Sequence, residues 1–267
     1  MKCYQGKVAV ITGAGSGIGR QLALQLAAAG ARLALSDINK KGLAETMKLL
    51  PVGTEARSYV LDVAKREEVF GHAAEVQRDF GTAHFIFNNA GVSLFATIEH
   101  STIEEIEWLL GINLWGVIYG TKAFLPMLLA QGEGHIVNFS SIFGLMTIPT
   151  QSAYHISKFG VRGFTECLAQ EMHGRGVGVT SVHPGGIRTA IGHQARMGKF
   201  ADETEKRLLP LIDKTLITPP EDLARAVLTG VAQGKRRVVY GHMAHSSDWM
   251  ARVFPASYSK LLKVFGL

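Results

Sequence analysis

The pattern most suggestive of chemistry in this sequence is a tyrosine and a lysine four residues apart. Tyr154 and Lys158 lie in a helical stretch, so their side chains project from the same face of the helix. A free tyrosine, with a pKa of about 10, is a poor base at neutral pH, but an adjacent ammonium favours the phenolate. Most such pairs are only solvated helix faces, so other residues must support a catalytic interpretation.

Hydroxyl and amide side chains at the ends of predicted strands supply that support. Ser140 and Ser141 follow a predicted strand at 135–139, and ligands bind at the carboxyl ends of the strands in open α/β sheets. The segment Asn88-Asn89-Ala90-Gly91 ends the preceding strand, 83–87. Asn113 interrupts an apolar helical run, for which a kink in the helix is the simple alternative.

A glycine-rich loop near the N-terminus predicts a dinucleotide site. The loop is Thr12-Gly13-Ala14-Gly15-Ser16-Gly17-Ile18-Gly19, between a predicted strand at 7–11 and a predicted helix at 17–29. Its glycines let the backbone turn sharply and approach a pyrophosphate, which the positive end of the helix attracts. A purely structural turn is the alternative, but the strand and helix on either side of the loop favour nucleotide binding.

An acidic residue at the end of the second strand indicates which dinucleotide is bound. Asp37 follows the predicted strand 32–36 and lies 18 residues after Gly19. A carboxylate there accepts hydrogen bonds from ribose hydroxyls and repels a 2′-phosphate, which favours NAD over NADP. Ser16 occupies a loop position where a basic residue would bind that phosphate. The alternative for Asp37 is an ordinary helix N-cap.

Strands and helices alternate along the chain, and this order predicts the fold. A parallel sheet covered by helices on both faces has strands that are apolar throughout. The sequence therefore predicts a single α/β domain over 1–267, a Rossmann-type doubly wound parallel sheet of about seven strands. The further strands are expected at 56–61, 178–182 and 237–240, and the further helices at 65–80, 103–130, 152–173 and 220–232. Residues 190–218 form a predicted substrate lid.

From about residue 7 to residue 240 the sequence resembles the classical short-chain dehydrogenase/reductase family. The spacing between the serine and the tyrosine of its motif selects Ser141 over Ser140. Each matching motif also lies in the secondary-structure context that the family requires. These motifs are Thr-Gly-x-x-x-Gly-x-Gly, Asp62, Asn-Asn-Ala-Gly, Asn113 in its helix, Ser141 thirteen residues before Tyr-x-x-x-Lys, and Pro184-Gly185.

The resemblance implies four catalytic residues. Tyr154 would be the acid/base, and Lys158 would lower the pKa of Tyr154 and bind the nicotinamide ribose. Ser141 would hydrogen-bond the substrate oxygen, and Asn113 would hold a water in a proton relay to Lys158. In the oxidative direction Tyr154 removes the alcohol proton while the cofactor takes the hydride.

The resemblance also assigns residues to the cofactor site. Asp62 would contact the adenine, Asn89 would line the site, and residues 184–189 would pack against the nicotinamide. For Pro184 and Gly185 a simple turn is the alternative. Besides Tyr154 and Lys158, the predicted cofactor-binding residues are Gly13, Ser16, Gly17, Ile18, Gly19, Asp37, Asp62, Val63, Asn89, Ala90, Gly91, Pro184, Gly185, Ile187 and Thr189.

The composition indicates the class of protein and the cellular compartment. Of 267 residues, 47% are hydrophobic and 19% are charged, which is typical of a globular protein. Cys3 and Cys167 are too few for a disulfide framework, and the N-terminus lacks the apolar stretch of a signal peptide, so a cytoplasmic protein is expected. His155, His183 and His193 lack the spacing of metal ligands, and no metal is predicted.

Charge argues against a nucleic-acid partner. The net charge is +6, but residues 234–267 hold six basic residues and one acidic residue. The rest of the chain is therefore almost neutral and shows no basic stripe.

The C-terminus departs from the family pattern. Many members end soon after the last strand, whereas this chain continues for 25 residues beyond His242. In the extension, 241–267, an amphipathic basic helix is predicted from Tyr258, Leu261, Leu262 and Phe265. It would pack on its own or a neighbouring subunit, close over the active site, or lie on an anionic membrane. We expect a homodimer through the helices near 114–130 and 152–173, or a homotetramer.

Together these patterns predict an NAD-dependent oxidoreductase acting on a secondary alcohol or ketone. Apolar residues in the lid suggest a bulky, lipid- or steroid-like substrate: Ile191, Met197, Phe200, Leu208, Leu209, Leu211 and Ile212. Small diols and hydroxyketones are the alternative substrates. An NADPH-linked 3-oxoacyl thioester reductase is a second candidate function, disfavoured by Asp37 and the altered C-terminus. A non-catalytic dinucleotide-binding sensor or scaffold is a third, and it leaves Ser141, Tyr154 and Lys158 without a role.

Overall fold

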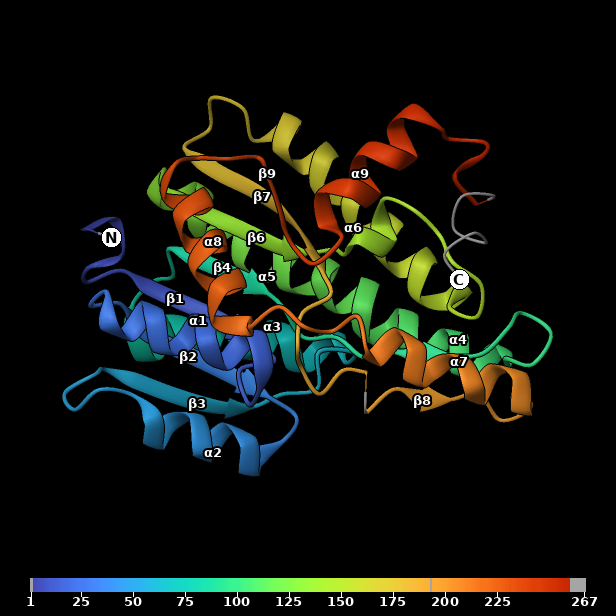
Figure 1. The fold of residues 1–267 in the computed structure, drawn as a ribbon. Helices are drawn as coiled ribbons and strands as arrows, with labels where there is room; N and C mark the ends of the chain where they lie inside the picture. The colour runs from blue at the N-terminus through green and yellow to red at the C-terminus, as the bar shows by residue number, and fades with distance from the viewer. Residues whose placement is uncertain (1, 193, 260–267) are drawn as a thin grey trace.

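A seven-stranded sheet forms the centre of the computed structural model, which describes residues 2–192 and 194–259. Its strand order is β3-β2-β1-β4-β6-β7-β9, and every neighbouring pair is parallel (Figure 1). This sheet confirms the predicted Rossmann-type fold. The strands are β1 (Val8–Thr12), β2 (Arg32–Asp37), β3 (Ala56–Val60), β4 (Phe85–Asn88), β6 (Gly134–Phe139), β7 (Val177–Gly185) and β9 (Arg237–Gly241).

Helices cover both faces of the sheet because successive strand residues point to opposite sides. On β1, Ala9 and Ile11 pack in the cluster with α1 and α8, whereas Val8 and Val10 pack in the cluster with α3, α5 and α6. The helices are α1 (Gly17–Ala28), α2 (Lys40–Leu49), α3 (Arg66–Phe80), α4 (Ile103–Leu110), α5 (Gly116–Gln131), α6 (Ser152–Glu171), α7 (Glu203–Asp213), α8 (Pro220–Ala232) and α9 (Ala244–Val253). Short 3-10 turns occur at Lys2–Tyr4 and Ile142–Gly144.

Two sequence-based expectations need correction. The strand β3 is not apolar throughout, because it is the outer strand of the sheet and exposes Arg57, Ser58 and Val60. The helix expected over 103–130 is interrupted between α4 and α5 by a π-helical segment, Gly111–Trp115. Such a bulge is common at functional sites. Here it carries Asn113, which is fully buried.

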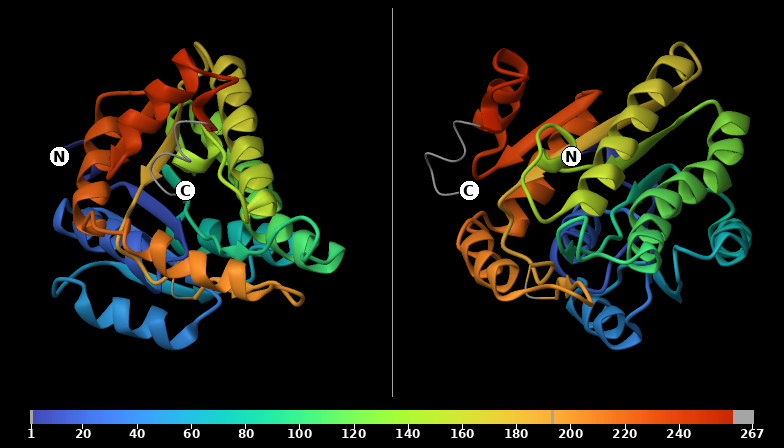
Figure 2. Two further views of the ribbon diagram at one scale, coloured as in Figure 1. Left: turned by 45° about the vertical axis from the view of Figure 1, so that its right-hand side comes forward. Right: turned by 90° about the vertical axis from the view of Figure 1, so that its right-hand side faces the viewer.

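The segment predicted to be a lid, 190–218, lies beyond the carboxyl ends of the strands, and it keeps the name lid below. Its strand β8 (Arg196–Met197) pairs in parallel with β5 (Leu94–Phe95), which follows the loop after β4. The helix α7 continues from β8, as the view onto this end of the sheet shows (Figure 2, right). The lid is therefore attached to the 89–100 segment by a small sheet that the sequence did not predict.

The C-terminal extension begins with α9, which packs near β7 and β9. In the segment after α9, the Tyr258 hydroxyl accepts a 3.0 Å hydrogen bond from the Thr147 N–H. The other positions of the predicted amphipathic helix, Leu261, Leu262 and Phe265, lie outside the described residues.

Candidate active site

The glycine loop forms a cradle at the start of α1. Gly13 and Gly17 have φ values of 68° and 49°, a conformation that favours glycine. A Cβ at Gly19 would lie 2.1 Å from the Gly13 carbonyl oxygen, so only glycine lets the helix pack this close to the loop. Ser16 is the N-cap residue, but its side chain makes no cap hydrogen bond. The free N–H groups of the first helical turn therefore face the cavity that the loop borders.

Asp37 is tied to this loop rather than to the helix that follows it. One carboxylate oxygen accepts a 2.8 Å hydrogen bond from the Gly15 N–H, and the other accepts one of 2.8 Å from the Asn39 N–H. The N-cap of α2 is Asn39, whose side chain accepts from Gly42, so the N-cap alternative for Asp37 does not hold. Asp37 lines the same cavity as the glycine loop, where a ribose would lie.

The wall opposite the loop comes from the ends of β3 and β4. Asp62, Val63, Ala90 and Gly91 line the cavity beside the glycine loop. Asn89 also lines it, but its side-chain amide donates a 2.9 Å hydrogen bond to the Thr12 carbonyl. Asn89 therefore holds the glycine loop against the end of β4.

Asn113 holds the loop after β4 from the other side. Its amide oxygen accepts a 2.8 Å hydrogen bond from the Val92 N–H, and its amide nitrogen donates one of 2.9 Å to the Val92 carbonyl. Both side-chain groups are therefore engaged by one backbone residue. A Cβ added at Gly91 would lie 3.3 Å from the Asn113 amide oxygen and 3.7 Å from the Lys158 nitrogen, so these two groups border the same space. The predicted water relay through Asn113 stays a prediction.

The two serines after β6 have different roles. The Ser140 hydroxyl donates a 2.8 Å hydrogen bond to the carbonyl of Lys158 and is buried. Ser141 accepts a 3.1 Å hydrogen bond from the Phe143 N–H, lines the same cavity as Tyr154 and lowers the pKa of that tyrosine. Ser141 is thus the serine beside the tyrosine, as the motif spacing predicts.

In the cavity wall Lys158 is buried and Tyr154 is half-buried. The Lys158 nitrogen lies 5.4 Å from the centre of the Tyr154 ring and donates a 2.9 Å hydrogen bond to the Phe139 carbonyl. Burial raises the pKa of Tyr154 to about 12, and the hydrogen bond from Ser141 acts in the opposite direction. Burial lowers the pKa of Lys158 to about 8. In the protein alone the desolvation of Tyr154 therefore outweighs the attraction that its neighbours offer to a phenolate.

At the end of β7 and just after it, some residues line the site and others belong to the sheet. Pro184, Ile187 and Thr189 line the cavity beside Tyr154. Gly185 lies within β7, where it pairs with Gly241, and it does not line either cavity. A Cβ at Gly185 would lie 2.6 Å from the His242 carbonyl oxygen, so this glycine serves packing. The neighbouring Gly186 faces the cavity instead.

The cavity beside Tyr154 adjoins the cavity of the glycine loop. The two cavities share Ile18, Asn89, Gly91, Thr189 and Ile191. A nicotinamide dinucleotide fits this arrangement, because glycines border the end where a pyrophosphate would lie and Asp37 stands where its ribose would. The other end holds Ser141, Tyr154 and Lys158.

Several wall residues of the catalytic cavity were not predicted from the sequence. The polar residues among them are Ser93, Gln151 and Thr215, and the apolar residues include Ile142, Phe143 and Leu216. Of the lid residues named above, Ile191 lines the cavity, whereas Phe200 is 58% exposed. The side chains of Leu209, Leu211 and Ile212 lie outside the described part of the structure.

Two of the three histidines that lack the spacing of metal ligands contact the loop after β6. His183 contacts the Ser141 carbonyl at 3.2 Å through Nδ1, and burial lowers its pKa to about 4. His155 contacts the Phe143 carbonyl at 3.0 Å, and burial lowers its pKa as well. Both rings therefore support the segment that carries Ser141, and His193 lies outside the described residues.

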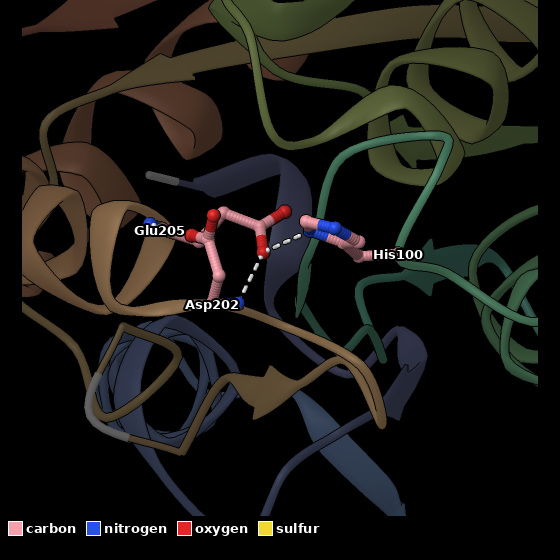
Figure 3. A group of neighbouring side chains, drawn as sticks. All are labelled: His100, Asp202 and Glu205. Atoms are coloured by element: carbon pink, nitrogen blue, oxygen red, sulfur yellow. Dashed lines mark hydrogen bonds and ion pairs between the residues drawn. The ribbon is translucent and has the colours of Figure 1, made fainter.

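A third histidine belongs to a cluster of hydrogen bonds that fastens the lid (Figure 3). Glu205 accepts a 2.8 Å bond from Nδ1 of His100 and a 2.8 Å bond from the Asp202 N–H. Its second oxygen accepts from the Thr97 N–H. Burial raises the pKa of Glu205, but the hydrogen bonds from Thr97, Asp202 and His100 outweigh burial and lower that pKa to about 2. The hydrogen bond to Glu205 raises the pKa of His100. We call Glu205, His100 and Thr97 the lid latch, because they join α7 to the loop after β5.

The comparisons with known proteins agree with this geometry. The family model described as short chain dehydrogenase matches residues 7–199. SadH of Mycobacterium tuberculosis, which is named as an oxidoreductase, is 48% identical over 98% of this chain and 96% of its own. Mouse estradiol 17-beta-dehydrogenase 11 is 31% identical over 98% of this chain and 84% of its own. A Burkholderia phymatum short chain dehydrogenase/reductase, solved in complex with NAD, has a TM-score of 0.83, is 30% identical and aligns over 89% of this chain and 90% of its own.

Proposed function

Because this chain belongs to the classical short-chain dehydrogenase/reductase family, we propose that it is an NAD-dependent oxidoreductase that interconverts a secondary alcohol and a ketone. One observation carries the proposal: Ser141, Tyr154 and Lys158 line a cavity that adjoins the glycine-loop cavity. A reacting carbon in the first cavity would therefore face a nicotinamide held by the second.

The residues of this chain would move the proton while the nicotinamide dinucleotide, when bound, supplies the hydride chemistry. Ser141 donates to the substrate oxygen and holds it beside Tyr154. In the oxidative direction the Tyr154 phenolate takes the hydroxyl proton, and in reduction the phenol returns it. Lys158, with its charge 5.4 Å from the ring, favours the phenolate, as does the positive charge of an oxidised nicotinamide.

The choice of NAD rests on Asp37. Its carboxylate borders the glycine-loop cavity and is fixed there by the N–H groups of Gly15 and Asn39. A 2′-phosphate placed at this carboxylate would meet a like charge, whereas ribose hydroxyls would donate hydrogen bonds to it. The Burkholderia neighbour was solved with NAD, which supports the same choice.

A largely apolar substrate is the second part of the proposal. The walls around Tyr154 include Ile142, Phe143, Ile187, Ile191 and Leu216, and Lys158 is the charged side chain among the described wall residues. Such walls bind a substrate by excluding water rather than by pairing charges. The relative named for estradiol supports a bulky apolar alcohol.

The third part of the proposal is that the protein forms a homodimer. Trp115, Ile156 and Phe159 expose 49%, 52% and 39% of their surface. They lie on the π-helical segment and on α6, which contact each other where Leu114 packs against Gly160. The helical segment Ile103–Gln131 is also apolar and long enough to cross a membrane, but Phe124 and Leu128 pack it into the core beneath the sheet. Sedimentation should give twice the 28.9 kDa chain mass, and Trp115→Glu should shift the protein towards monomer.

Turnover of secondary alcohols tests the chemistry. Oxidation of 2-propanol and 2-octanol with NAD⁺ or NADP⁺ is followed by the absorbance of the reduced nicotinamide. We expect faster turnover with NAD⁺ and a larger kcat/KM for 2-octanol. Tyr154→Phe should lower kcat by about 10²–10⁴-fold.

The control is Tyr119→Phe, a tyrosine outside both cavities whose loss of a hydroxyl should leave kcat unchanged. Unchanged turnover in Tyr154→Phe would refute the role of the tyrosine. Faster turnover with NADP⁺ would refute the role of Asp37.

A further inference from the structure

Two polar side chains in the apolar wall beside Tyr154 have no hydrogen-bond partner among the residues that the structure describes. Gln151 is 6% exposed and Ser93 is 8% exposed, and both line the catalytic cavity. Among the described residues, no side-chain hydrogen bond involves the Gln151 amide or the Ser93 hydroxyl. The fully enclosed, unpaired polar atoms of the described residues include none from Gln151 or Ser93. The polar atoms of these two side chains are therefore open to the cavity.

The buried polar side chains Ser140, Ser157 and Asn113 around the site are already paired. Ser140 donates to the Lys158 carbonyl, and Ser157 donates a 2.7 Å hydrogen bond to the Tyr154 carbonyl. Asn113 is engaged by Val92. Because buried polar groups in proteins are almost always hydrogen-bonded, the two exceptions on one cavity wall call for a partner that enters the cavity.

The backbone holds both residues firmly. The Gln151 carbonyl accepts a 2.9 Å hydrogen bond from the His155 N–H, and the Ser93 carbonyl accepts one of 2.9 Å from the Arg196 N–H of the lid. Thr150, the residue before Gln151, has a φ of 71°, which is unfavourable for a β-branched residue. Backbone strain of this kind clusters at binding sites, where the surrounding structure maintains it.

The charge of the cavity limits the class of ligand. Lys158 is the charged side chain among its described wall residues, and its ammonium is engaged by the Phe139 carbonyl. A primary amide both donates and accepts hydrogen bonds, and so does a hydroxyl. This pair of side chains suits an uncharged hydroxyl or carbonyl group rather than a carboxylate or a phosphate.

The position of Gln151 limits where that group lies on the ligand. Gln151 is the N-cap residue of α6, Tyr154 lies in the first turn of that helix, and both line the same cavity. A group that hydrogen-bonds Gln151 while the reacting oxygen is beside Tyr154 therefore lies close to the reacting carbon.

We propose that Gln151 and Ser93 determine specificity by hydrogen-bonding a second, uncharged oxygen function of the substrate, next to the reacting carbinol. This inference rests on the proposed function. The substrate is then a mainly apolar alcohol with a vicinal hydroxyl or carbonyl group, whose chain lies against the apolar wall.

The test compares 2-octanol with octane-2,3-diol as substrates of the wild type and of Gln151→Leu and Ser93→Ala. We expect the wild type to have a kcat/KM at least tenfold higher for the diol. Gln151→Leu should remove this preference, so that kcat/KM becomes equal for the two substrates. Ser93→Ala should reduce the preference in part. Gln77→Leu, a matched change on the exposed face of α3, should keep it.

Binding separates this inference from the proposed function. Calorimetry measures the affinity of the wild type and of Gln151→Leu for both compounds in the presence of NADH, whether or not either compound is oxidised. Tighter binding of the diol that disappears in Gln151→Leu supports the inference even if turnover fails. Equal binding of the two compounds, no binding of either, or a preference that survives in Gln151→Leu would overturn it.

Discussion

The ammonium nitrogen of Lys158 lies 5.4 Å from the centre of the Tyr154 ring, on the same helix one turn further along. Lys158 is buried and Tyr154 is half-buried, and desolvation moves their pKa values apart, to about 12 for the tyrosine and about 8 for the lysine. Desolvation therefore opposes the charged form of each, and a positive charge near the ring has a large influence on the phenol because the surroundings are apolar.

The charge of Lys158 should appear in the pH dependence of alcohol oxidation. Without the ammonium, the phenolate is less favourable, so Lys158→Met should lower kcat/KM most at neutral pH. Because the pKa of Lys158 is about 8, the wild-type lysine loses its charge above that pH. The ratio of wild-type to Lys158→Met kcat/KM, measured from pH 6 to 10, should therefore be largest below about pH 8 and fall above it. Lys122→Met, on the exposed face of α5, serves as control. A ratio independent of pH would show that Lys158 only packs against the site.

Gly19→Ala should damage the cofactor cradle. The new methyl group would lie 2.1 Å from the Gly13 carbonyl oxygen, so α1 or the loop must move. Overpacking of this kind costs about 1–3 kcal/mol of the free energy of unfolding, and we expect at least tenfold weaker NADH binding by fluorescence titration. Gly71→Ala on α3 is the matched control, since a Cβ there meets nothing within 4 Å. It should leave binding unchanged and raise stability by up to about 1 kcal/mol. Equal NADH affinity in both variants would contradict the cradle.

Asp37→Asn should relax the preference for NAD. The substitution keeps the shape of the side chain but removes the charge that would repel a 2′-phosphate. We expect the ratio of kcat/KM for NADP⁺ to that for NAD⁺ to rise at least tenfold, which corresponds to about 1.4 kcal/mol. Asp222→Asn on α8 removes an acidic charge outside both cavities and should leave the ratio as it is. An unchanged ratio in Asp37→Asn would show that the loop, not the charge, selects the cofactor.

Glu205→Gln should loosen the lid latch. The carboxylate is 2% exposed and accepts hydrogen bonds from Thr97, His100 and Asp202. A hydrogen bond to a charged group contributes about 1.5–3 kcal/mol, so losing one should speed hydrogen exchange of the α7 amides roughly tenfold or more. Glu203→Gln, on the same helix but with its side chain in solvent, should leave exchange unchanged. Equal protection in the two variants would contradict the latch.

The latch also predicts how the lid responds to pH. The pKa of Glu205 is lowered from 4.5 to about 2, so its contribution is present above pH 4.5 and is lost as the pH falls through about 2. The pKa of His100 is raised above 6.5 by Glu205, so its contribution is present below pH 6.5 and is lost as the pH rises through the raised value. Protection of α7 from exchange, corrected for the intrinsic rate, should therefore be greatest between about pH 4.5 and 6.5. Protection that increases steadily up to pH 9 would contradict this sign.

The sheet and the catalytic motif could be predicted from local patterns in the sequence. The glycine loop, Asp37 and the Tyr154–Lys158 pair were identified from sequence because each depends on residues close together in the chain or on a strand end that periodicity reveals. The π-helical segment around Asn113 was not identified, since an apolar run with a single asparagine does not distinguish a bulge from a continuous helix.

Tertiary structure decided which side chains face the cavity and which have partners. Gly185 matches a motif but packs against β9. The side-chain amides of Asn89 and Asn113 form hydrogen bonds with backbone groups. Ser93 and Gln151 belong to no motif, and their unpaired polar groups show only when α6, the loop after β4 and the lid are brought together. A sequence records the donors and acceptors that each residue offers. Whether each finds a partner depends on contacts between distant segments, which only the folded chain fixes.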